Sequence, residues 1–274
     1  MKRTLKSIAA VSTVFGVVAP SAFAGLTATL YAYQNPAPGN VQPAGYRDPN
    51  SVGGEFTAVL SGNSSLSSTI LSQYSPNAVV TLNNGQTGFE TFCTEYTVEF
   101  TPGTTYSASI GSTIVSGSGN APLAQGVAWL YMQFATGNLA TYASTQFGSS
   151  YSSGDYNYSV GSSRETCADE LQNAIWYLQG EVSGQGTDPF VELVEKVFGN
   201  LSTAEESTTA TGASNFGVDV LNLCGTNNST AFAQDQLVYV GAVPEPSTIA
   251  AGAMLLLPLG WTTVRALRSR KNNG

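Results

Sequence analysis

The chain has no histidine among its 274 residues. This absence removes the most frequent general base, the most frequent zinc ligand and every arrangement in which histidine activates a serine or cysteine. Carboxylate pairs such as Glu95 with Glu99 and Asp169 with Glu170 do occur. A glycosidase needs two carboxylates that flank a sugar, and no further motif indicates such a site here. We therefore expect neither a hydrolase or other enzyme, nor a cofactor or metal site.

Basic residues are scarce in the body of the chain. Between residues 25 and 243 only Arg47, Arg164 and Lys196 occur, against 17 acidic residues, which gives a net charge near −14. A surface of this charge repels phosphate backbones and anionic lipid, so we expect no nucleic-acid partner. The region is long enough to bury one sizeable hydrophobic core.

The N-terminus has a short basic segment, an apolar run over residues 8–18 and a small-residue pattern at residues 22–24. This order is typical of a secretory signal peptide, which signal peptidase removes. The apolar run is too short for a membrane-spanning helix. We therefore predict a signal peptide at residues 1–24 and export across the inner membrane.

The C-terminus also has three parts. These are Pro244, Glu245 and Pro246, then an apolar stretch at residues 249–264, and then a basic tail that includes Arg265 and Arg268. The apolar stretch predicts a transmembrane helix of marginal length. Because basic residues stay on the cytoplasmic side, the body of the protein is expected outside the inner membrane. Residues 241–274 are thus predicted to be a separate segment that crosses the membrane transiently.

This C-terminal pattern resembles the PEP-CTERM sorting signal of Gram-negative bacteria. The resemblance implies recognition by an exosortase, cleavage near the Pro-Glu-Pro motif, and delivery to the cell surface or to an exopolysaccharide matrix. An ordinary C-terminal membrane anchor is the alternative.

The body of the chain shows strand patterns on both sides of helical patterns. Period-two alternation and β-branched or aromatic residues predict strands at residues 25–34, 55–60, 78–82, 89–100, 105–110, 216–223 and 236–240. Apolar residues at helical spacing predict three helices, which begin near Asn120, Ser162 and Asp188. The order predicts an α+β fold over residues 25–240, mainly an antiparallel β-sandwich or barrel with a helical lobe inserted at about residues 120–200.

Three cysteines remain in what is expected to be an oxidising compartment: Cys93, Cys167 and Cys224. Because the number is odd, at least one of them is free, bonded to another chain or chemically used in another way. A regular strand at residues 89–100 would place Cys93 on its less apolar face. That position favours a reactive or bonded cysteine over a buried structural one.

Two short motifs carry a second resemblance. Residues 91–93 (Thr-Phe-Cys) lie in a predicted strand, and residues 171–176 (Leu-Gln-Asn-Ala-Ile-Trp) lie in a predicted helix. Together they resemble the paired motifs of bacterial surface thioester domains, which implies an internal thioester between Cys93 as the thiol and Gln172 as the acyl donor. Such a bond needs shelter from water, which we expect from Phe92, Trp176 and Tyr177.

Two functions remain open from the sequence. In the first, the thioester joins the exported protein covalently to an amine on a surface or matrix polymer or protein, which would leave Cys167 and Cys224 to form a disulfide. In the second, the protein is a non-catalytic component of an exopolysaccharide or biofilm matrix and Cys93 is structural. Disulfides from Cys93 to either other cysteine also remain open.

Overall fold

The computed structural model describes residues 25–32, 53–116, 119–159, 161–210, 212–225 and 232–241. The predicted signal peptide lies outside these residues, as does the predicted sorting segment apart from Gly241. Within the described part, no helix is both long and apolar enough to span a membrane. The described residues form an α+β fold with a seven-stranded antiparallel sheet and several helices, which confirms the α+β, antiparallel part of the prediction.

The main sheet has the strand order β3-β4-β2-β1-β5-β8-β9. Its strands are β1 (Thr27–Tyr31), β2 (Phe56–Ser61), β3 (Val79–Thr81), β4 (Thr87–Thr91), β5 (Thr105–Gly111), β8 (Val218–Cys224) and β9 (Phe232–Tyr239). A two-stranded sheet of β6 (Thr113–Ser116) and β7 (Gly119–Pro122) was not predicted. The alternation predicted for the first strand is confirmed, because Ala28 and Leu30 are fully buried while their neighbours in β1 are half-buried.

The strand predicted at residues 89–100 is shorter than expected. β4 ends at Thr91, and the following residues leave its line and pair with β9. The N–H of Leu237 donates to the carbonyl of Phe92 at 3.1 Å, and the N–H of Thr94 donates to the carbonyl of Asp235 at 3.0 Å. The chain after β4 therefore binds to the edge strand at the other end of the sheet order.

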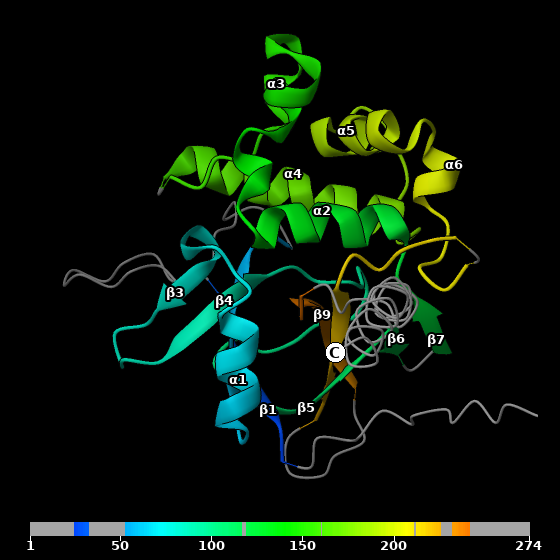
Figure 1. Cartoon of the computed structure of the whole chain (residues 1–274). Helices are drawn as coiled ribbons and strands as arrows, with labels where there is room; N and C mark the ends of the chain where they lie inside the picture. Colours follow the sequence, from blue (N-terminus) through cyan, green and yellow to red (C-terminus); the bar gives the residue numbers. More distant parts are fainter. Residues whose placement is uncertain are drawn as a thin grey trace, which may run out of the picture.

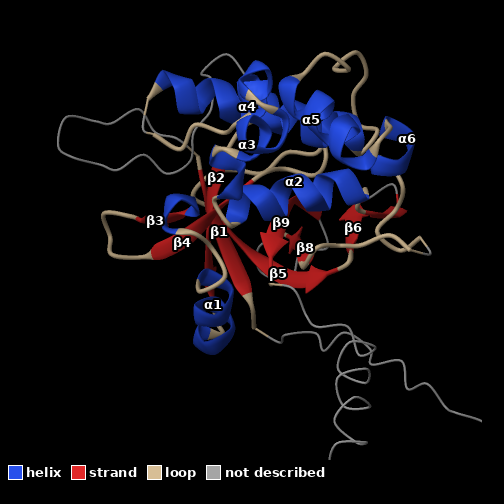
Figure 2. Cartoon of the chain, turned by 45° about the horizontal axis from the view of Figure 1, so that its top comes forward, coloured by secondary structure: helices blue, strands red, loops and turns tan. Residues whose placement is uncertain are grey.

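The helices gather mainly on one side of the strands, as Figures 1 and 2 show for α2 to α6, whereas α1 lies at the opposite end of the molecule. The helical elements are α1 (Ser64–Leu71), η1 (Pro76–Ala78), α2 (Gln125–Ala135), η2 (Asn138–Ala140), α3 (Tyr142–Phe147), η3 (Ser149–Gly154), α4 (Ser162–Leu178), α5 (Pro189–Phe198) and α6 (Leu201–Ala204). α2 and α4 bury Leu130 and Ile175 in one core with Leu221 and Leu237 of the sheet.

Two predicted helix starts differ from the structure. Asn120 was expected to cap the first long helix, but it lies in β7, and α2 begins at Gln125 after the hairpin. The amide of Gln179 binds the carbonyl of Pro122 and the N–H of Ala124 instead, at 3.0 Å each. Ser162 was expected to cap α4 but is its first helical residue, and no side chain caps that helix at Gly161.

The predicted start and end of α5 are confirmed. Pro189 is its first residue, and Gly199 ends it in the left-handed conformation at φ 82°, which suits a residue without a Cβ atom. The Oδ1 atom of Asp188 accepts the N–H groups of Phe190 and Val191 at 2.9 and 3.3 Å. The carboxyl group of Asp188 is buried, and burial is the main cause that raises its pKa to about 7.

This buried cap makes the stability of the fold depend on pH. Because the pKa of Asp188 is raised from 3.8 to about 7 in the folded state, the native protein binds the proton more tightly than the unfolded chain does. The resulting stabilisation, as much as ~4 kcal/mol, is present below the unfolded pKa and is lost as the pH rises through 7. Nearby Glu170 and Glu192 raise this pKa further.

We expect Asp188→Asn to remove much of this pH dependence. The amide Oδ1 keeps both cap hydrogen bonds but carries no charge to desolvate, so the variant should be more stable than the wild type at pH 8 and about equal to it at pH 4. Urea unfolding at the two pH values measures both free energies. Equal slopes of stability against pH in the two proteins would contradict the assignment to Asp188.

A buried ion pair joins the sheet to the helical layer. Arg164 of α4 is 5% exposed, and its guanidinium binds both carboxylate oxygens of Glu55, which is fully buried at the start of β2. The same guanidinium donates to the carbonyls of Tyr158 and Asn77 at 2.8 and 3.1 Å. The hydroxyl of Tyr156 donates to Glu55 at 2.7 Å. This network satisfies two buried charges that would otherwise be costly.

Candidate functional site

Cys93 lies between the sheet and α4, at the point where the chain after β4 pairs with β9. Its side chain is 1% exposed and packs with Phe56 and Trp176 in a small apolar cluster separate from the main core. The expectation that Cys93 sits on the less apolar face of a strand is therefore wrong, because the strand ends two residues before it. Cys93 is therefore shielded from solvent and packed on its neighbours.

Gln172 is fully buried, and it contacts the backbone of Cys93. Its Oε1 atom accepts the N–H of Cys93 at 2.9 Å, and its Nε2 atom donates to the carbonyl of the same residue at 2.8 Å. The structure thus brings the two predicted thioester residues together, 79 positions apart in the chain. Both ends of the Gln172 amide are bound to the backbone, however, and neither of these hydrogen bonds involves the sulfur.

A second glutamine lies against the thiol itself. Gln236 of β9 is fully buried and forms an isolated antiparallel bridge with Cys93. Its Nε2 atom is 3.4 Å from Sγ of Cys93, and its Oε1 atom is 3.8 Å from the same sulfur. Nε2 also donates to the carbonyl of Gln234 at 3.1 Å. The thiol of Cys93 therefore contacts both the oxygen and the nitrogen of this carboxamide.

Sequence reasoning missed Gln236, although β9 contains a signal. Residues 234–236 (Gln-Asp-Gln) are three consecutive polar residues inside a strand that ends in Leu-Val-Tyr, and all three are buried. Polar side chains in a buried strand need partners. Such a run therefore indicates a polar site in the interior, but not which residue it faces.

The wall of this site differs in part from the prediction. Trp176 lies beside Cys93 as expected, and the ring of Tyr96 meets its indole edge-on at a centroid distance of 5.0 Å. Phe92 instead packs against Phe134 in the main core, with ring centroids 5.0 Å apart. Tyr177 is also packed against the main core. Of the three residues expected to shelter the thiol, Trp176 alone belongs to its cluster.

Gly53 lies directly against Trp176 and Gln172. A Cβ atom at this position would lie 2.4 Å from the indole of Trp176 and 2.5 Å from Cγ of Gln172. Contacts that short do not occur between real side chains, so any larger residue would displace the tryptophan or the glutamine. The backbone of Gly53 therefore lies in close contact with the side chains of Trp176 and Gln172.

Burial controls the protonation of the thiol. Burial is the largest effect and raises the pKa of Cys93 to about 12. The hydrogen bond from Gln236 lowers this pKa, and the charge of Glu95 raises it. Cys93 is therefore a neutral thiol at pH 7, and thiolate, the nucleophilic form, is scarce. Any reaction at this sulfur must rely on how closely the reacting atoms are held.

Cys167 of α4 and Cys224 of β8 are separate, partly buried free thiols, so the disulfide predicted between them is not formed in the structure. Their surroundings differ. Burial is the main cause that raises the pKa of both thiols. The charge of Glu170 also raises the pKa of Cys167, and the charge of Asp235 also raises that of Cys224. Counting cysteines could not show that α4 and the end of β8 carry them into different environments.

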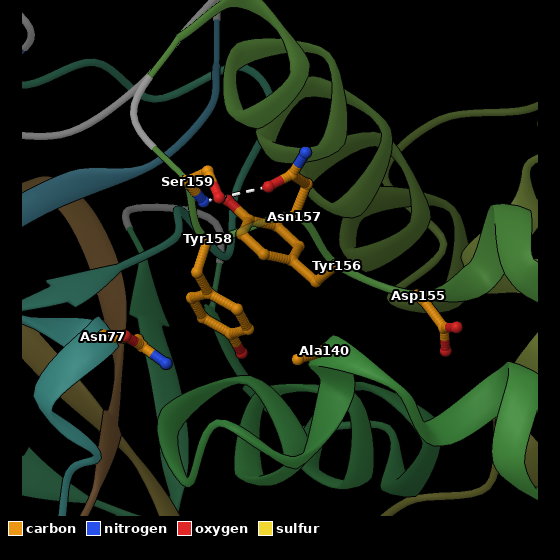
Figure 3. Close-up of a pocket in the computed structure, with 7 residues that line it drawn as sticks. All are labelled: Asn77, Ala140, Asp155, Tyr156, Asn157, Tyr158 and Ser159. Atoms are coloured by element: carbon orange, nitrogen blue, oxygen red, sulfur yellow. Dashed lines mark hydrogen bonds between the residues drawn. The ribbon is translucent and has the colours of Figure 1, made fainter.

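A surface hollow of about 610 Å³ lies elsewhere, between Asn77 and the segment of residues 155–159 (Figure 3). Its polar groups already have structural partners. Asp155 accepts the N–H of Ala143 at 2.7 Å, and the hydroxyl of Tyr156 donates to Glu55. None of its lining residues belongs to the cluster around Cys93, so this hollow is not part of the candidate site.

Comparison of the chain with protein-family models, with curated proteins and with solved structures finds no match. The sorting motif residues Pro244, Glu245 and Pro246, and the basic residues Arg265 and Arg268, lie outside the described residues. The geometry around Cys93 and the two sequence resemblances are therefore the features that bear on function.

Proposed function

We propose that the protein is an exported surface or matrix protein that attaches covalently to a partner through an internal thioester between Cys93 and Gln236. The observation that carries this proposal is the carboxamide of Gln236, which lies alongside Sγ of Cys93 in a cluster that excludes water. Gln172 is then the residue that holds the backbone of Cys93 in place, and Gln236 replaces it as acyl donor.

The bond-forming step follows from these contacts. Sγ of Cys93 attacks the carbonyl carbon of Gln236, the C–N bond breaks, and the thiol proton leaves with Nε2 as ammonia. An amide is a poor electrophile, so the reaction depends on proximity, which is worth up to about 7–11 kcal/mol in well-oriented systems. The carbonyl of Gln234, which accepts a hydrogen bond from Nε2, fixes the leaving group.

The thioester then acts once. A primary amine on a surface or matrix polymer or protein displaces Cys93, and Gln236 remains joined to it by an amide. The protein is therefore an adhesin and not an enzyme that turns over.

The pairing of residues 92–94 with β9 also favours describing the sheet as a barrel that closes at the reactive residues, in preference to a sandwich.

The route to the cell surface is part of the proposal. Signal peptidase would remove residues 1–24, and an exosortase would process the PEP-CTERM segment after the predicted helix at residues 249–264 has held the protein in the inner membrane. The destination is the cell surface or extracellular matrix of a Gram-negative bacterium. The strongly acidic body opposes binding to nucleic acid.

A second function is supported by the burial of Cys93. A cysteine that is 1% exposed and has its pKa raised to about 12 also fits an inert structural residue. In that case the protein is exported in the same way but is a non-catalytic component of an exopolysaccharide or biofilm matrix.

Intact mass separates the two functions. The full chain, expressed and purified without added amines, is expected to be lighter by one ammonia than its processed sequence requires, and methylamine should add to it. Cys93→Ala should show neither effect, because it lacks the attacking sulfur. A wild-type mass that corresponds to free thiols or disulfides, with no methylamine adduct, would favour the passive matrix component.

A further inference from the structure

Glu95 lies close to the proposed thioester and has no assigned role. It is 5% exposed and follows Cys93 by two residues. Its Oε2 atom accepts the N–H of Asp235 at 3.2 Å, and its carbonyl accepts a short hydrogen bond from the side-chain amide of Gln234. Both partners directly precede Gln236 in β9, so the carboxylate faces the strand that carries the acyl donor.

The reaction with an amine requires proton transfer that Cys93 and Gln236 do not provide. A primary amine such as lysine, with a pKa near ~10.4, is protonated at neutral pH and has no lone pair for attack. The departing sulfur also needs a proton, because burial raises the pKa of the Cys93 thiol to about 12. A group beside the thioester that takes a proton from nitrogen and passes it to sulfur would meet both needs.

The other carboxylates near Glu95 accept hydrogen bonds from backbone N–H groups elsewhere. Asp235 accepts the N–H groups of Val115 and Leu223 at 2.7 and 2.8 Å. Glu181 is exposed and accepts the N–H of Tyr96 at 3.2 Å. The chain contains no histidine. Among the described residues, the placement of Glu95 two residues after Cys93 and against β9 therefore suits it best for proton transfer.

We infer that Glu95 is the proton-transfer residue of the amine reaction, an inference that rests on the proposed thioester. The carboxylate of Glu95 takes a proton from the incoming ammonium group, and the free amine attacks the carbonyl carbon of Gln236. As the C–S bond breaks, Glu95 gives that proton to Sγ of Cys93. The second nitrogen proton then passes through Glu95 to water, which leaves an amide, a thiol and one released proton.

The surroundings of Glu95 tune it for this work. Burial is the main cause that raises its pKa above the ordinary range, and the charge of Glu181 raises it further, while the N–H of Asp235 lowers it. A raised pKa makes the carboxylate a stronger base. Because the ionised form is the one that accepts a proton, the rate with amines should rise with pH as Glu95 ionises.

Substitution of Glu95 by glutamine tests this role. With the full chain, Glu95→Gln should still lose one ammonia but react with methylamine at least ~100-fold more slowly, the usual scale of acid–base catalysis. Glu181→Gln is the matched control, since it removes the same charge from the same region, and its rate should change by less than about threefold if long-range attraction of the cation is minor. An equal loss in both variants would mean attraction alone and would overturn the inference.

Two further measurements distinguish proton transfer from a purely structural role of Glu95. Glu95→Asp keeps a carboxylate and should recover part of the lost rate, whereas a purely structural role predicts no such recovery. Hydroxylamine is mostly neutral at pH 7 but ionises just below it, so its rate with the wild type is expressed per concentration of the neutral form. That rate should follow a single ionisation above the ordinary range of glutamate, and absence of that ionisation overturns the inference even if Glu95→Gln does not fold. Absence of ammonia loss in the wild type would instead refute the proposed thioester itself.

Discussion

Replacing Gln236 by alanine should abolish both the loss of ammonia and the methylamine adduct, because it removes the carboxamide that contacts Sγ of Cys93. Gln172→Ala should act differently. It leaves the N–H and carbonyl of Cys93 without their partners, which costs about 1–3 kcal/mol for each buried group. The molecules that remain folded should still form the thioester, although less completely.

The methylamine adduct also shows directly which glutamine was the acyl donor. Peptide mapping of the adduct should place the methylamide on residue 236 and not on residue 172. Gln234→Ala is a suitable control, because it removes a buried glutamine of the same strand whose amide binds Glu95 and leaves the proposed donor in place. A methylamide on Gln172, or ammonia loss that survives in Gln236→Ala, would return the role of donor to Gln172.

The choice between these glutamines shows what sequence could supply at the site. The resemblance of the motifs around Cys93 and Gln172 to thioester domains paired these two residues, and they are in contact in the structure. The sequence did not say whether Gln172 contacts the thiol or the backbone of Cys93. This depends on the bridge between Cys93 and Gln236, a contact across 143 positions that no local pattern encodes.

The fold shows a similar division. The alternation of residue types along residues 25–34 made β1 predictable. Asp188, Pro189 and Gly199 made the ends of α5 predictable through local backbone chemistry. The end of β4 at Thr91 was missed, because residues 92–100 keep an apolar alternation while their backbone turns to pair with β9. Tertiary pairing there overrides the strand propensity.

Loss of the Arg164 side chain should produce the largest loss of stability in the described fold. Arg164→Met leaves Glu55, which is fully buried, with a charge that only the hydroxyl of Tyr156 contacts among the partners described above. Removing one member of a buried ion pair costs about 3–5 kcal/mol. Urea unfolding at pH 7 should show this loss, whereas Lys196→Met, which removes an exposed cation from the helical layer, should cost less than about 1 kcal/mol.

We expect the charge on Glu55 to cause this loss, and a double variant isolates it. The double variant Glu55→Gln with Arg164→Met keeps an acceptor for Tyr156 but removes the unpaired charge, so it should be more stable than Arg164→Met alone. If the double variant were no more stable than the single one, the loss would come from the carbonyls of Tyr158 and Asn77, which Arg164 also holds, and not from the charge.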